Sequence, residues 1–199
     1  MQCTIQHCVT CFEALISAFN NEDPILNPLE SDSNVISVPM FVTLKKNTGD
    51  GKIPSVLRGC IGTLNPRPLS ELRIFAIKSA FEDRRFSPLE KHELQFCEIT
   101  VSLLVKYEPG KDYLDWDVSI HGIIIEFEID SKSFRSTFLP GVVLEMNWNK
   151  QTSIDKLIVK SGFNGLISKS LYNSIRLTRY QSSKQTLSYA EFMSRKKSI

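Results

Sequence analysis

"LRGCIGT" fills residues 57–63 and places an arginine and a cysteine two positions apart, with glycines beside the cysteine. In an extended strand alternate residues share a face, so Arg58, Cys60 and Gly62 are expected to point the same way. A nearby guanidinium stabilises a thiolate, and Gly59 and Gly62 let a ligand or another backbone approach closely. The stretch therefore fits two interpretations: a reactive thiol held beside a fixed positive charge, or a small buried cysteine in a core strand.

The composition is that of an ordinary globular protein. The 199 residues are 42% hydrophobic and 23% charged, which is enough apolar material for a full core, as one domain or as two closely packed lobes. The net charge is +2, and the basic residues are dispersed apart from a short run at 195–197. Proteins that bind nucleic acids through their phosphates present a basic stripe, so a nucleic-acid partner is not expected.

The sequence carries no sign of a membrane or secretory protein. No apolar run approaches the ~20 residues needed to span a bilayer, and "MQCTIQHCVT" at 1–10 lacks the regions of a signal peptide. We therefore expect a protein of the cytoplasm and nucleus, whose five cysteines are reduced. Cys3, Cys8 and Cys11 have a C-x4-C-x2-C spacing, but an amphipathic helix should contain the last two, so neither a metal site nor another cofactor is expected.

Hydrophobic periodicity and turn residues predict helices and strands that mix without regular β-α-β alternation. Strands are expected at 37–45, around "LRGCIGT", and at 97–107, 118–130, 133–140 and 174–180. Helices are expected at 9–20 and 70–81, after a capping pattern at 152–155, and after Ser188. "KKNTGDGK" at 45–52 predicts a hairpin turn, and the pattern as a whole predicts an α+β fold with a largely antiparallel sheet flanked by helices.

Two other places carry candidate chemistry. His121 adjoins an apolar strand, where it is either a general base or ligand, or a histidine at the core edge bonded to a backbone carbonyl. The run 82–86, "EDRRF", either ends a helix in solvent with local ion pairs, or turns Asp83 and Arg85 into a cleft where they orient a polar substrate.

Seven segments together resemble the AMMECR domain family over nearly the whole chain. They are LRGCIGT at 57–63, A-x3-A-x2-D-x-RF at 76–86, EITVSLL at 98–104, DYLDW at 112–116, HGI at 121–123, LP at 139–140 and LTRYQ at 177–181. The resemblance implies one domain over residues 1–199, built from two unequal lobes with a cleft between them near the LRGCIG strand. The family motif falls on Arg58, Gly59, Cys60, Gly62, Asp83, Arg85, Phe86, His121 and Gly122.

Neither the resemblance nor the residues decide the reaction, and two hypotheses stay open. In the first, the protein is an enzyme or small-ligand binder in which Cys60 is a nucleophile or redox thiol and His121 a base. Asp83 and Arg85 would then position the substrate, with Arg58, Gly59 and Gly62 beside it. In the second, the protein is a non-catalytic intracellular adaptor that docks a protein or peptide in the same cleft.

Overall fold

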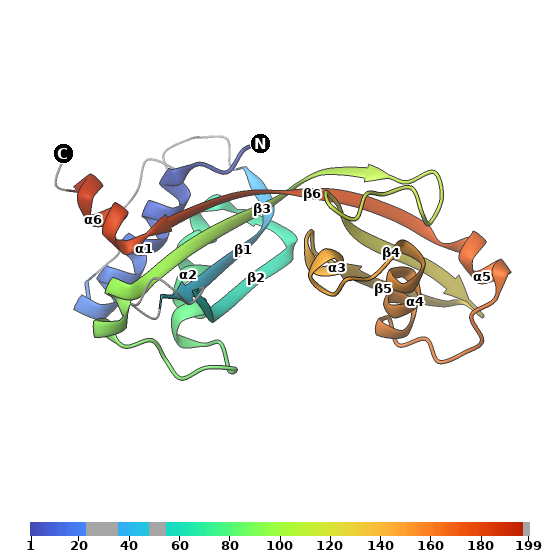
Figure 1. Cartoon of the computed structure of the whole chain (residues 1–199), viewed down its shortest axis with the longest axis horizontal. Coiled ribbons are helices and arrows are strands. Elements are labelled where there is room, and N and C mark those ends of the chain that lie inside the picture. Colours follow the sequence, from blue (N-terminus) through green and yellow to red (C-terminus); the bar gives the residue numbers. More distant parts are fainter. Residues whose placement is uncertain (23–35, 48–54, 197–199) are drawn as a thin grey trace. The chain divides into compact units, whose positions relative to one another are not determined.

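The computed structural model describes residues 1–22, 36–47 and 55–196 (Figure 1). The strands are β1 (Ser37–Lys46), β2 (Val56–Pro68), β3 (Cys97–Pro109), β4 (Gly122–Ile129), β5 (Lys132–Phe138) and β6 (Arg176–Ser188). The α-helices are α1 (Ile5–Asn20), α2 (Leu72–Phe81), α3 (Val142–Glu145), α4 (Lys150–Lys160), α5 (Lys169–Ser174) and α6 (Tyr189–Lys196), and η2 (Leu69–Glu71) and η3 (Lys91–Phe96) are 3₁₀ helices. Most of the "KKNTGDGK" turn lies outside the described residues.

The six strands form one sheet in the order β2-β1-β3-β6-β4-β5. β1 pairs antiparallel with β2 and with β3, and β4 pairs antiparallel with β5 and with β6. With its helices this is an α+β fold, as the sequence predicts. β6 is much longer than the predicted strand at 174–180. Its second half is polar and alternates only weakly, so the sequence pattern did not reveal it as part of the strand.

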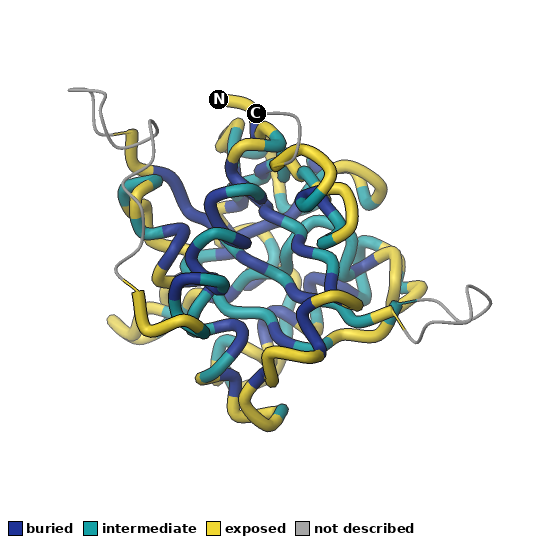
Figure 2. The backbone as a smooth tube through the Cα atoms, turned by 90° about the vertical axis from the view of Figure 1, so that its left-hand side faces the viewer, coloured by how far each residue is buried: buried dark blue, intermediate teal, exposed yellow. Residues whose placement is uncertain are grey.

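The chain divides into two compact units. Unit 1 comprises residues 1–104 and 183–199, and unit 2 comprises residues 105–182, so that β3 and β6 contribute residues to both. Within the described part of the chain, no helix is long and apolar enough to cross a membrane. Figure 2 shows the buried segments of the backbone in dark blue and the exposed ones in yellow.

The core of unit 1 forms where α2 packs on β1 and β2 and α1 packs on α2. The helical period of 70–81 predicts an inward face, and the residues on it are all buried: Leu72, Phe75, Ala76, Ser79 and Ala80. The apolar alternation of 97–107 predicts that every second residue of β3 is buried. This holds from Cys97 to Val101, but Ser102 and Leu104 are buried as well, and Tyr107 is 40% exposed.

Helix starts differ from the predicted ones because local caps set them. α1 begins at Ile5 instead of residue 9, since Thr4 and His7 form a capping box in which His7 Nδ1 accepts the Thr4 N–H at 2.9 Å. Cys8 and Cys11 lie in this helix as expected, and both are fully buried. Before α2 the chain forms the turn η2, so Ser70 does not cap that helix.

Unit 2 packs α4 on β4 and β5 around a cluster of buried apolar side chains that includes Ile123, Ile125 and Ile154. The turn between β4 and β5 holds Asp130 and Ser131 at positive φ, 49° and 61°, as a tight hairpin requires. α4 is capped by Asn149, whose side chain accepts the Thr152 N–H at 2.8 Å, and not by the predicted Thr152. Gly162 follows it with φ of 91°, in the place expected for a C-terminal glycine.

Gly59 is the point where α2 touches β2. A Cβ added there would overlap the carbonyl oxygen of Ser79, in the last turn of α2. The helix therefore lies directly against the backbone of the strand, and the absence of a side chain at Gly59 allows this close approach of the helix backbone.

We predict that Gly59→Ala destabilises the protein by about 1–3 kcal/mol, because the new methyl group must push helix and strand apart. Where the backbone allows it, the same substitution ordinarily stabilises by about 0.4–1 kcal/mol. Urea unfolding of both proteins measures the difference.

Gly162→Ala is the matched control, because a Cβ there meets nothing within 4 Å and only the φ of 91° is unfavourable. The Gly59 variant should lose more stability than this control. Wild-type stability in Gly59→Ala would show that the contact with Ser79 does not constrain the fold.

Candidate functional site

The LRGCIG strand is the edge strand β2, and its pairing with β1 is irregular at Arg58. Gly59 lies opposite Leu44 and Leu57 lies opposite Lys45, so Arg58 has no opposite residue on β1. Such a bulge interrupts the strict alternation of faces. The expectation that Arg58 and Cys60 share one face rested on that alternation.

Arg58 is bonded to the segment that follows α2. Its guanidinium pairs with Glu93, donating from Nε to Oε1 at 3.2 Å and from Nη2 to Oε2 at 2.8 Å. It also donates to the carbonyl oxygens of Ser87, at 2.7 Å, and Pro88, at 3.2 Å. Arg58 therefore anchors this connection to β2, and these bonds direct it toward Glu93.

Glu93, which the sequence reasoning did not single out, is the centre of this buried network. Lys46 Nζ donates to its Oε1 at 2.8 Å, and the backbone N–H of Glu90 donates to Oε2 at 2.9 Å. The hydrogen bonds from Arg58, followed by those from Lys46 and Glu90, lower the pKa of Glu93 to about 2 against the cost of its burial. The feature of the sequence that could have pointed to Glu93 is the Glu90-x-x-Glu93 spacing, which forms a capping box at the start of η3.

Asp83 and Arg85 bond to the backbone of Cys60. Asp83 Oδ2 accepts the backbone N–H of Cys60 at 2.8 Å. The Arg85 guanidinium donates to both carboxylate oxygens of Asp83, from Nε to Oδ1 at 2.9 Å and from Nη2 to Oδ2 at 2.7 Å. Arg85 Nη2 also donates to the carbonyl oxygen of Cys60 at 3.2 Å. The Arg85 guanidinium holds the pKa of the buried Asp83 well below its usual range.

Cys60 differs from the other cysteines in exposure. All five lie in the described residues, and Cys60 is half-buried while the other four are buried. Burial raises the pKa of Cys8 and Cys97 to about 11 and that of Cys3 to about 12, and it raises that of Cys11 well above the ordinary value. The Cys60 sulfur lies 3.2 Å from Thr43 Oγ1 on the neighbouring strand.

Gly62, like Gly59, is closed by protein atoms. A Cβ at Gly62 would overlap the Met40 carbonyl oxygen and the Phe41 ring. At both glycines the missing side chain therefore allows β2 to pack closely against its neighbours.

His121 belongs to unit 2, just before β4. Its Nδ1 accepts the backbone N–H of Asp117 at 2.9 Å, and the backbone N–H of His121 donates to the Asp117 carbonyl oxygen at 2.8 Å. Because Nδ1 is an acceptor, the neutral ring carries its proton on Nε2 and offers a donor there. A base acting through Nε2 would require the other tautomer and loss of the Asp117 bond.

The contacts thus bring Arg58, Cys60, Asp83 and Arg85 together around β2 in unit 1. His121 makes its bonds within unit 2, and its membership of the same site stays a prediction. Among the residues that the structure describes, no group of three or more His, Cys, Asp or Glu side chains is arranged to hold a metal ion.

Comparison with known proteins decides the family. The family model AMMECR1 matches residues 8–185. The chain belongs to the AMMECR1 family. An uncharacterized protein of Arabidopsis thaliana is 44% identical over 94% of this chain and 86% of its own length, and an uncharacterized protein of Schizosaccharomyces pombe is 36% identical over 94% of both.

The fold of the AMMECR1 chain has a counterpart among solved structures. The crystal structure of an uncharacterized protein from Pyrococcus horikoshii superposes with a TM-score of 0.66, at 21% identity, over 91% of this chain and 89% of that one. This likeness supports the α+β architecture described above.

We predict that Glu93→Gln lowers the free energy of unfolding at pH 7 by on the order of 3 kcal/mol. A carboxyl group whose pKa is lowered by folding stabilises the protein above its unfolded pKa, near 4.5, and this stability is lost as the pH falls toward 2. Denaturant unfolding at pH 7 and pH 3 should therefore show the difference between wild type and variant shrinking at the lower pH.

Glu128→Gln, at an exposed position of β4, is the control and should change little at either pH. A loss of stability in Glu93→Gln that is the same at both pH values would mean that the charge on Glu93 does not matter.

Proposed function

We propose that this AMMECR1 protein binds a small ligand beside the LRGCIG strand, with Cys60 as the reactive thiol and Arg85 as the group that holds a negative charge of the ligand. The observation that carries the proposal is the exposure of Cys60. It is the one of five cysteines that is not buried, and a guanidinium is bonded to its own carbonyl group.

The contacts of Arg85 support its part in this proposal. Its side chain is 56% exposed, and within the described residues Nη1 makes no hydrogen bond. The hydrogen bond to Asp83 raises the pKa of Arg85, and the nearby Cys60 adds to this effect. Arg85 is thus a fixed cation that can donate to a carboxylate or phosphate group of a ligand beside Cys60.

Arg58, Asp83 and the two glycines serve the site indirectly in this proposal. Arg58 is bonded to Glu93, and Asp83 is bonded to Cys60 and Arg85. Neighbouring protein atoms fill the space beside the two glycines. We therefore assign them to positioning the strand. For His121, the acceptor role of Nδ1 places the proton of the neutral ring on Nε2, which supports a hydrogen-bond donor more than a base.

The alternative of a docking surface for a protein partner has less support at this strand. β2 is an edge strand, which is where an extended peptide adds to a sheet. However, the N–H of Cys60 already donates to Asp83, and the N–H of Ile61 donates to Ser79 Oγ at 2.9 Å. A peptide would have to displace both bonds. A reactive thiol also fits the reducing cytoplasm and nucleus, where we expect the protein.

We predict that iodoacetamide alkylates Cys60 about tenfold or more faster than Cys97 in the folded protein at pH 7.5, because a buried thiol with a raised pKa is neither accessible nor ionised. Arg85→Met should slow the reaction of Cys60, since a neighbouring positive charge is lost. Peptide mapping by mass spectrometry after timed quenching measures both rates.

Arg84→Met is the matched control, because Arg84 is an exposed arginine on the same turn. It should leave the rate at Cys60 unchanged. Equal, slow labelling of Cys60 and Cys97 would contradict the proposal. If the Cys60→Ala variant keeps cellular function while the Arg85→Glu variant loses it, the docking alternative replaces the proposal of a reactive thiol.

A further inference from the structure

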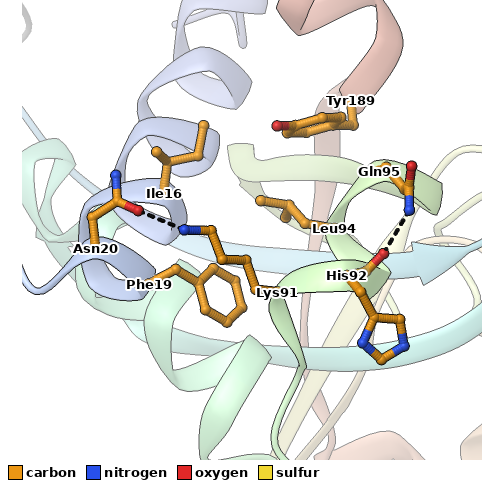
Figure 3. Close-up of a pocket in the computed structure, with 8 residues that line it drawn as sticks. All are labelled: Ile16, Phe19, Asn20, Lys91, His92, Leu94, Gln95 and Tyr189. Carbon is orange, nitrogen blue, oxygen red and sulfur yellow. Dashed lines mark hydrogen bonds between the residues drawn. The ribbon is translucent and has the colours of Figure 1, made fainter.

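A second place in unit 1 has the shape of a small-molecule site. A hollow of about 310 Å³ lies between the end of α1, the 3₁₀ helix η3 and the first residue of α6 (Figure 3). This volume is at the lower end of the range for ligand pockets. None of the residues predicted from the sequence as site residues lines it.

Half of the residues that line the hollow are apolar or aromatic. Ile16 and Phe19 come from the last turns of α1, Leu94 from η3 and Tyr189 from α6. Figure 3 shows the Tyr189 ring and Leu94 facing the space from one side and Ile16 from the other. Leu94 is buried, and the other three are half-buried. Together they can take up an apolar body of one or two rings.

The rim of the hollow offers hydrogen-bond donors and a positive charge. Lys91 Nζ donates to the Asn20 side-chain oxygen at 2.9 Å, which leaves two of its three protons for another acceptor. Gln95 Nε2 donates to the His92 carbonyl oxygen, and the His92 ring lies 3.1 Å from Glu90. No carboxylate is among the residues that line the hollow, and in the described part of the chain Lys91 forms no ion pair.

We propose that this hollow binds a small amphipathic carboxylate. Its apolar body would lie against Leu94 and Tyr189, and its carboxylate would accept from Lys91. The hydrogen bond to Asn20, the last residue of α1, holds the Lys91 ammonium group at the hollow, so its charge is in place before a ligand binds. The site is separate from the one around Cys60, and it does not depend on the reactivity of that thiol.

The test uses the full chain and two probes of equal shape, 2-naphthoate and its neutral counterpart 2-naphthamide. Titration calorimetry of wild type should show saturable binding of the acid, and weaker binding of the amide. Lys91→Gln should lower the affinity for the acid about three- to fivefold, as expected for a partly exposed ion pair, and leave the amide unchanged.

Three further proteins make the result specific. Lys184→Gln, at another exposed lysine of unit 1, should bind both probes like wild type. Ile16→Trp fills the hollow and should bind neither, while circular dichroism confirms its fold. Cys60→Ala should bind the acid normally. The proposal fails if wild type shows no saturable binding, if Lys91→Gln keeps the preference for the acid, or if Ile16→Trp still binds.

Discussion

The contact between the last turn of α2 and the LRGCIG strand is the constraint on which unit 1 depends. Ser79 lies against Gly59, and its hydroxyl group donates to the Val42 carbonyl oxygen at 2.8 Å while accepting the Ile61 N–H. One helix residue thus bonds to both strands of the β1–β2 pair. An edge strand exposes backbone groups that must find partners. Here the Ser79 hydroxyl group of α2 is the partner of the Ile61 N–H, and a larger residue at 59 would move it out of reach.

The charged residues of the motif divide into structural and available ones. Arg58 and Asp83 are buried or nearly so and have ionised partners, Glu93 and Arg85 respectively. Buried charges are tolerated when they are paired and fully hydrogen-bonded, and breaking such a pair is strongly destabilising. Arg85 combines both functions, because it neutralises Asp83 and still faces solvent. The backbone of Cys60 is therefore held on both its N–H and its carbonyl group, and the exposed Arg85 is bonded to that carbonyl oxygen.

Repeating patterns allowed much of this fold to be predicted, and irregularities limited the prediction of the site. The inward face of α2 and the first half of β3 follow from period and alternation, because burial selects apolar residues there. The partner of Arg58 could not be found in this way. A single bulge at that residue changes its direction, and Glu93 is 35 residues away in the chain. Pairing over such a distance is fixed by the path of the whole connection and leaves no local pattern.

The helix η3 connects the two proposed binding sites of unit 1. In a 3₁₀ helix, residues three apart lie one above the other. Lys91 and Leu94 share one such row and His92 and Gln95 a second, and all four line the hollow. Glu90 and Glu93 form the third row, which carries the cap and the anchor to Arg58. The same short helix therefore turns its carboxylate toward β2 and its lysine toward the hollow, so that the ion pair buried at the strand fixes the position of the proposed binding wall.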